Sequence, residues 1–147
     1  LSVQGQAEAE EILRLVNAGV LPRPTQIFCS PKKRTSETML PIARSLQISI
    51  QVTEELDERK NHERVADFLE RIEAFLLPLQ DAYQVNDVIY ICSHMDWLEE
   101  AMTIIPSSDN DDDLAMPFQA AEYRSFEISN HQGRKNWKLI RHQKENK

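Results

Sequence analysis

The chain contains 147 residues and carries a formal net charge of −7 at pH 7. This length suits one domain with its own hydrophobic core, and we expect a single domain over residues 1–147. The acidic balance argues against nucleic acid as a partner, because binding to a phosphate backbone needs a broad positive surface. No apolar run approaches the roughly 18 residues of a membrane-spanning helix, so we expect no membrane partner and a cytoplasmic protein.

The spacing of apolar residues and the positions of turn residues predict the helices and strands of the chain. They predict helices over 4–17, 31–45, 65–79 and 95–105, strands over 25–29, 48–53 and 88–92, and a terminal hairpin over 123–140. The strand over 48–53 alternates in polarity and is expected at a sheet edge. The strands over 25–29 and 88–92 are apolar throughout, which is typical of strands buried on both faces. Pro41 should kink the second helix, and Pro78 should bend or end the third.

A strand-to-helix junction at Ser30 carries three consecutive cations. Ser30 is a good N-cap and Pro31 suits a first helical position, so the helix is predicted to begin there. Lys32, Lys33 and Arg34 are unfavourable at the positive end of a helix dipole unless an anion binds beside them. Arg34 offers the fork that matches two phosphate oxygens, whereas the two lysines are expected in water, with at most a steering role. The alternative is that all three cations are simply solvated.

A second junction of the same kind ends in Ser93 and His94. Ligands of open α/β sheets bind outside the carboxyl ends of parallel strands, so Arg34 and His94 should converge on one anion at the same sheet edge. A helix N-terminus should also keep His94 neutral until an anion arrives. The structural alternative is a histidine that caps its own helix.

These segments resemble the histidine phosphatase (phosphoglycerate mutase-like) superfamily, most closely its small phosphohistidine-phosphatase branch. The motifs that carry the resemblance are Leu1 and Gly5 before the first helix, Ser30-Pro31-x-x-Arg34-x-x-x-Thr38, Leu56-Asp57-Glu58-Arg59 and Ser93-His94. The resemblance implies a three-layer α/β/α fold with a mostly parallel sheet. It implies phosphoryl transfer through a phosphohistidine intermediate, without a cofactor, on a phosphorylated small molecule or a phosphoprotein.

Carried onto this sequence, the resemblance implies three catalytic residues, His94, Arg34 and Glu58. It implies Arg34, His94 and Ser30 as phosphate-binding residues, and no metal. Glu58 stands where many family members carry a proton donor, and an exposed loop glutamate is the alternative. The sequence indicates neither the substrate nor the oligomeric state.

One departure from the family concerns the nucleophile. The family's nucleophilic histidine lies in an Arg-His-Gly motif, which occurs nowhere in this chain, and the remaining histidines at 62, 131 and 142 lack that neighbourhood. We therefore expect the nucleophile on a strand upstream of Leu1, between the strands at 25–29 and 88–92, and an inactive chain as given. The alternatives are a non-catalytic phosphate- or partner-binding relative and a receiver-like α/β domain, which would need clustered acids at the strand ends.

Two further features need an interpretation. Cys29 and Cys92 are expected to be free thiols about 10 Å apart, because a third strand should separate the strands that bear them. The acidic run over 109–113 lacks the glycine and the distant glutamate of a calcium loop, so it is expected to be a solvated loop.

Overall fold

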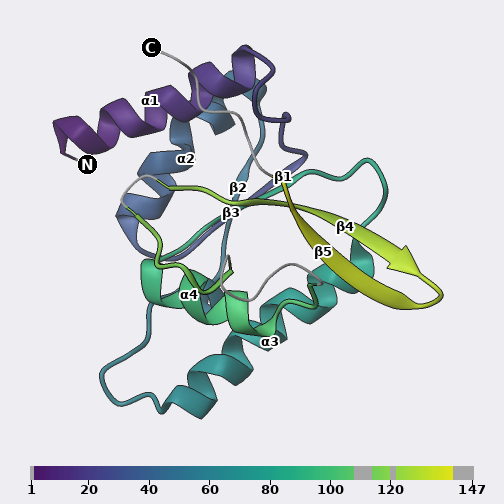
Figure 1. Cartoon of the computed structure of the whole chain (residues 1–147). Helices are drawn as coiled ribbons and strands as arrows, with labels where there is room; N and C mark the ends of the chain where they lie inside the picture. The colour runs from purple at the N-terminus through teal and green to yellow at the C-terminus, as the bar shows by residue number, and fades with distance from the viewer. Residues whose placement is uncertain (1, 108–113, 120–121, 141–147) are drawn as a thin grey trace.

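The structure is a computed structural model that describes residues 2–107, 114–119 and 122–140 (Figure 1). Its helices are α1 (Val3–Asn17), α2 (Lys33–Leu46), α3 (Val65–Ala82) and α4 (Met95–Ile104), with a 3-10 turn η1 (Glu54–Leu56). Its strands are β1 (Gln26–Cys29), β2 (Ile50–Val52), β3 (Ile89–Cys92), β4 (Ser125–His131) and β5 (Arg134–Ile140). None of the helices in these ranges is long and apolar enough to cross a bilayer. The acidic run over 109–113 lies outside the described residues.

The main sheet has three parallel strands in the order β2-β1-β3. The predicted edge position of β2 is confirmed. The prediction that a further strand separates β1 from β3 is wrong, because these strands pair directly, from Gln26 opposite Ile89 to Cys29 opposite Cys92. An apolar strand sequence indicates that both faces of the strand are covered. It does not indicate which strands form hydrogen bonds with the two edges of that strand. Among the described strands β3 pairs only with β1, and its four residues are half-buried.

Helices cover both faces of this sheet, which gives the predicted α/β/α layers (Figure 1). Ile27 and Cys29 of β1 pack with residues of α1 and α2, whereas Phe28 packs with residues of α3 and α4. This alternation follows from the twofold period of a strand, which sends successive side chains to opposite faces. The fold therefore has two apolar cores, one on each side of the sheet.

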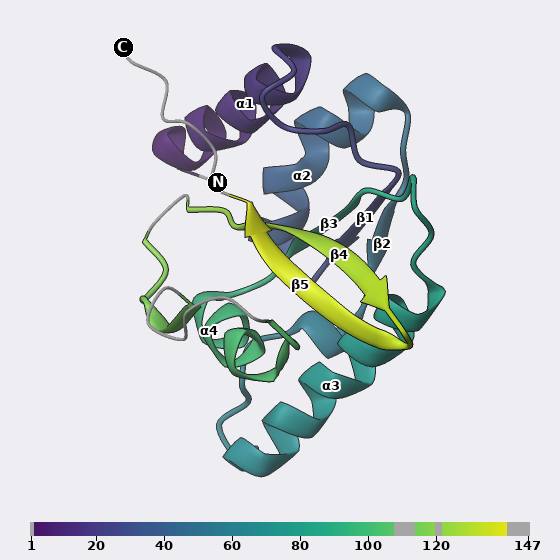
Figure 2. The same cartoon turned by 45° about the vertical axis from the view of Figure 1, so that its right-hand side comes forward.

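The hairpin β4–β5 forms a separate two-stranded antiparallel sheet (Figure 2). Its turn places Gln132 and Gly133 at φ 53° and 81°, the left-handed conformation that two-residue hairpin turns require. Trp137 of β5 packs into the core of α3 and α4, and its Nε1 donates to Gln80 Oε1 at 2.7 Å. The hairpin predicted at the end of the chain is thus confirmed, and it lies on the α3 and α4 side of the molecule.

Two helix boundaries differ from the prediction. Helix α2 begins at Lys33 rather than at Pro31, and the N-cap position falls on Lys32, which has extended backbone and no side-chain capping hydrogen bond. Helix α3 continues past Pro78 to Ala82, so this proline does not end it. The later start of α2 places Lys32 at its N-cap, and Lys33 and Arg34 in its first turn.

Candidate anion site

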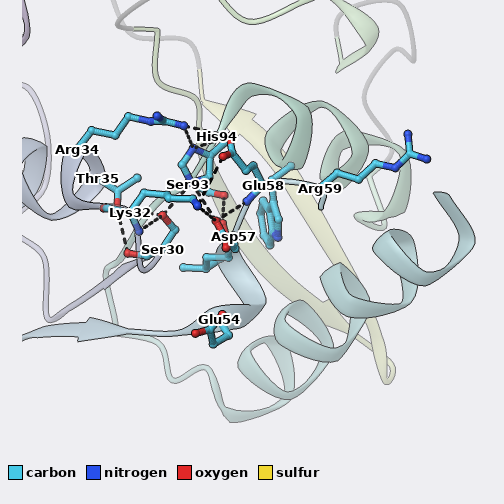
Figure 3. Close-up of polar contacts among 12 residues, drawn as sticks. Ser30, Lys32, Arg34, Thr35, Glu54, Asp57, Glu58, Arg59, Ser93 and His94 are labelled. Atoms are coloured by element: carbon cyan, nitrogen blue, oxygen red, sulfur yellow. Dashed lines mark hydrogen bonds and ion pairs between the residues drawn. The ribbon is translucent and has the colours of Figure 1, made fainter. Parts of the chain in front are cut away.

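Three segments deliver polar side chains to the carboxyl edge of the parallel sheet (Figure 3). The chain leaves β1 at Ser30 and leaves β3 at Ser93 and His94, and the loop after β2 carries Asp57 and Glu58. The Ser30 amide donates to the Cys92 carbonyl at 3.2 Å, so the first two segments stay together beyond the strands. The edge predicted from the two strand-to-helix junctions is therefore the edge at which these side chains meet.

Arg34 and His94 converge, as predicted from the topology. Arg34 Nη2 lies 3.1 Å from His94 Nδ1 and 3.0 Å from Glu58 Oε2. A guanidinium nitrogen can only donate, so Nδ1 accepts and the ring proton of His94 lies on Nε2. The arginine that was predicted to bind an anion is thus paired with a carboxylate of the same chain.

A buried hydroxyl network fixes the other side of the histidine ring. His94 Nε2 donates to Ser30 Oγ at 2.8 Å, and Ser30 Oγ also accepts from the Lys32 amide at 3.2 Å. The Ser30 hydroxyl then donates to Thr35 Oγ1 at 3.1 Å, which itself donates to the Lys32 carbonyl at 2.8 Å. Every hydrogen-bonding position of the Ser30 hydroxyl is used. The serine, which is fully buried, supports His94 and is closed to a ligand in this arrangement.

Burial and charge act together on His94. Burial lowers the pKa of this imidazole below its usual value, and the neighbouring Arg34 cation lowers it further, although nearby carboxylates oppose the shift. His94 occupies the N-cap position of α4, but its side chain makes no capping hydrogen bond. The ring is therefore neutral at pH 7 and oriented by Arg34 and Ser30, and the alternative of a histidine that caps its helix does not apply.

Lys32 belongs to this cluster, whereas Lys33 does not. The Lys32 ammonium lies 3.8 Å from Glu58 Oε1 and 4.0 Å from Asp57 Oδ1. The Lys33 side chain is 89 % exposed and pairs with Glu37 on its own helix. The sequence predicted the same solvated position for both lysines. Which of the two side chains faces the cluster depends on the residue at which α2 begins.

Asp57 also belongs to the cluster, although it was not predicted from the sequence as a site residue. Its side chain is 10 % exposed, and Oδ1 lies 3.8 Å from His94 Nε2 and accepts from the Glu58 amide at 2.9 Å. Two carboxylates, Asp57 and Glu58, thus face two cations, Lys32 and Arg34. The cluster is close to electrically balanced when it holds no ligand. The available sequence signal was two acids directly after the buried Leu56.

Other residues of the predicted motifs lie outside the cluster. Thr38 Oγ1 donates to the Arg34 carbonyl within α2 at 2.8 Å. The Arg59 side chain points away from His94, and Glu54 lies apart from the cluster (Figure 3). Within the described residues no group of three histidine, cysteine or acidic side chains could hold a metal ion.

The two cysteines are free, as predicted, but their separation is not the predicted 10 Å. Cys29 and Cys92 are register partners on adjacent strands, so one inter-strand spacing of about 4.8 Å separates their backbones. The hydrogen bond of the Cys29 thiol to Cys92 and its burial both raise the pKa of Cys29. The cause of the error is the same as for the strand order: β1 and β3 are direct neighbours.

The carboxyl edge of the parallel sheet thus holds an arginine, a lysine and a buried neutral histidine, which are residue types that can bind phosphate groups. A family model described as the histidine phosphatase superfamily (branch 1) matches residues 1–62, and no curated protein sequence matches the chain. This match covers less than half of the chain, and the fold is phosphoglycerate mutase-like.

Solved structures of similar fold include three bacterial proteins. Alpha-ribazole phosphatase from Shigella flexneri has a TM-score of 0.66 at 13% identity, over 95% of this chain and 83% of that one. Mycobacterial hydrolase 1 has a TM-score of 0.64 at 13% identity, over 93% and 81%. Mycobacterial glucosyl-3-phosphoglycerate phosphatase has a TM-score of 0.53 at 12% identity, over 78% and 69%. At these identities the likeness concerns the fold.

Proposed function

We propose that the chain supplies the phosphate-binding part of a phosphatase site that works through a phosphohistidine intermediate. The observation that carries the proposal is the convergence of Arg34 and His94, 3.1 Å apart at the carboxyl edge of the sheet, with Lys32 beside them. Arg34 and Lys32 would bind the phosphoryl oxygens, and neutral His94 would share a proton with one of them. The proposed substrates are a phosphomonoester or a phosphohistidine of a phosphoprotein, as in the small phosphohistidine-phosphatase branch.

The proposed nucleophile is a histidine outside residues 1–147. It attacks phosphorus, a phosphorus–nitrogen bond forms, the bond to the ester oxygen breaks, and an acid protonates that oxygen. Water then attacks phosphorus, so that the phosphorus–nitrogen bond breaks and phosphate leaves. Of the two carboxyl groups at the cluster, Glu58 is 41 % exposed and Asp57 is 10 % exposed. Glu58 is therefore the proposed acid, since its side chain can reach a bound leaving group.

The second edge of β3 is the place that we propose for the strand that bears this nucleophile. Among the described strands β3 has only β1 as a partner, yet Ile89, Tyr90 and Ile91 are apolar or aromatic and only half-buried. β3 also leads directly into Ser93 and His94. A strand added at that edge would end beside His94 and would leave the direct pairing of β1 with β3 intact.

The proposal is tested by binding of inorganic phosphate and vanadate to residues 1–147, measured by calorimetry. Arg34→Ala should weaken binding by about 1–2 kcal/mol, below the full range for charge-assisted hydrogen bonds because 59 % of the Arg34 side chain is exposed. Lys33→Ala is the matched control, since it removes the same charge one residue earlier from a side chain outside the cluster.

Equal phosphate affinity for the Arg34 and Lys33 variants would contradict the assignment of the site. Residues 1–147 should also release no phosphate from an aryl phosphate, because the proposed nucleophile lies outside them. Hydrolysis by this chain alone would show that the nucleophile has been wrongly placed.

A further inference from the structure

One arginine outside the cluster holds the loop that carries its two carboxylates. Arg71 lies on α3, and 16 % of its side chain is exposed. Its Nη1 donates to the Asp57 carbonyl at 2.7 Å, and its Nη2 donates to the Glu58 carbonyl at 3.2 Å. Nη1 also donates to the carbonyls of Glu54 at 3.3 Å and Glu55 at 3.1 Å. A single guanidinium thus binds four backbone carbonyls of η1 and of the loop that follows it.

Glu63 holds the guanidinium itself in place. Arg71 Nε lies 3.0 Å from Glu63 Oε2 and Nη2 lies 2.8 Å from Oε1, which is the bidentate geometry of a strong ion pair. The hydrogen bond to Glu63 raises the pKa of Arg71, so this cation stays charged throughout the ordinary pH range. The Arg71 guanidinium also lies over the Phe68 ring, 5.0 Å from its centroid. The arginine is therefore fixed before it contacts the loop.

Other contacts hold neighbouring parts of the segment, and the Asp57 amide donates to the Glu54 carbonyl at 3.0 Å. Trp97 Nε1 donates to the Glu55 carbonyl, the Ser93 hydroxyl donates to the Leu56 carbonyl, and the Arg59 amide donates to Asp96. Among the described residues the hydrogen bonds to the Asp57 and Glu58 carbonyls come from Arg71. The carbonyl groups of the backbone that bears the Glu58 side chain are thus held from α3.

We infer that Arg71 is a positioning residue, which fixes the Asp57–Glu58 backbone so that the Glu58 carboxylate faces Arg34 and Lys32. The inference rests on the proposed function, because it assigns Arg71 to the site at which phosphate would bind. A lysine could not replace Arg71, since one ammonium nitrogen cannot reach four carbonyls and a carboxylate together. Arg71 does not touch the bound phosphate in this scheme and acts through the loop.

Backbone hydrogen exchange of residues 1–147 without ligand tests the positioning role directly. The Glu58 amide, which donates to Asp57, should exchange about tenfold faster or more in Arg71→Met and Arg71→Lys. Its rate is compared with that of the Thr53 amide, which donates to the Cys29 carbonyl beside the sheet, so that global unfolding is separated from loop opening. Arg64→Met is the matched control, because Arg64 carries the same charge at the start of α3 and is 81 % exposed.

A double-mutant cycle, read out as the affinity for inorganic phosphate, then tests whether Arg71 acts on the site through Glu58. Glu58→Gln should tighten binding of inorganic phosphate about fivefold in the wild-type and Arg64→Met backgrounds, because it removes the internal anion from Arg34. In the Arg71→Met and Arg71→Lys backgrounds the same change should have less than about a twofold effect, since Glu58 no longer faces Arg34.

Three outcomes overturn the inference. Unchanged Glu58 exchange in the Arg71 variants would show that other contacts hold the loop. A fivefold effect of Glu58→Gln on phosphate affinity in the Arg71→Met background would show that Arg71 only stabilises the fold. The same fivefold effect in the Arg71→Lys background would show that a positive charge alone is enough to position Glu58. If the loop opens as expected but no variant binds phosphate, the proposed function fails and the assignment of Arg71 to an anion site fails with it.

Discussion

Glu58→Gln is the substitution that most directly tests whether Glu58 competes with phosphate at the proposed anion site. In the structure the Glu58 carboxylate occupies the cations that a phosphate group would need, with contacts of 3.0 Å to Arg34 and 3.8 Å to Lys32. Its Oε2 also lies 4.0 Å from His94 Nδ1. Phosphate that binds Arg34 Nη2 must compete with this carboxylate for the same nitrogen. Glutamine keeps the shape of the side chain and removes the charge.

The magnitude follows from the exposure of the pair. About 59 % of the Arg34 side chain and 41 % of the Glu58 side chain are exposed, so the ion pair is worth the roughly 0.2–1 kcal/mol of a surface pair. The longer contact with Lys32 adds a smaller amount of the same sign. Removal of this competition should therefore favour phosphate binding by about 1 kcal/mol, which is about a fivefold tighter dissociation constant.

Calorimetric titration of inorganic phosphate at pH 7.5 and low ionic strength measures this change. Glu54→Gln is the control, because Glu54 lies in the adjoining turn η1, is exposed and stands apart from the cluster (Figure 3). The control should shift affinity by less than about twofold, since screening by salt weakens the effect of distant surface charges. The difference between the two variants should shrink as salt is added.

Three results would refute this reasoning. Equal affinities for Glu58→Gln and Glu54→Gln would mean that only net charge matters. An affinity for Glu58→Gln equal to that of the wild type would mean that the carboxylate does not compete with phosphate. Weaker binding by Glu58→Gln would mean that Glu58 contributes to the bound state rather than to the unbound one.

Two further predictions concern stability, measured as the free energy of unfolding in urea. Burial and the Arg34 cation lower the pKa of folded His94, so the unfolded state binds the extra proton as pH falls below the ordinary value of 6.5. The stability from neutral His94 is complete above that value and is lost below it, with a slope of at most about 1.4 kcal/mol per pH unit for one proton. His94→Gln should remove this part of the slope between pH 7 and pH 5, and parallel curves would contradict it. Ile72→Ala should cost about 2–5 kcal/mol, because Ile72 is fully buried between α3 and the sheet and its truncation leaves a cavity. Leu77→Ala, on the exposed side of the same helix, should cost less than about 1 kcal/mol, and similar losses for both would contradict the cavity argument.

The sequence by itself determined the elements and the place of the site. Helical spacing over 65–79 and apolar runs over 25–29 and 88–92 depend on which faces are buried, and that property is written locally in the chain. Two parallel strands that each end in a small residue before a helix bring Arg34 and His94 to one edge, whatever lies between them. Their convergence could be predicted for this reason, without knowledge of the strand order.

Only the tertiary structure decided which strands are neighbours and which polar residues support the site. The direct pairing of β1 with β3 depends on contacts between segments about sixty residues apart, and two apolar strands look the same in sequence whether or not a third separates them. Lys32 lies at the N-cap of α2 and reaches Asp57 and Glu58, whereas Lys33, the first residue of the helix, pairs with Glu37 on its exposed side. In the sequence, Arg71 is one polar residue within the apolar pattern of α3. Its contacts exist only when the loop that carries Asp57 and Glu58 packs against α3. Local periodicity encodes burial, whereas the partners of a buried polar group are chosen by long-range packing.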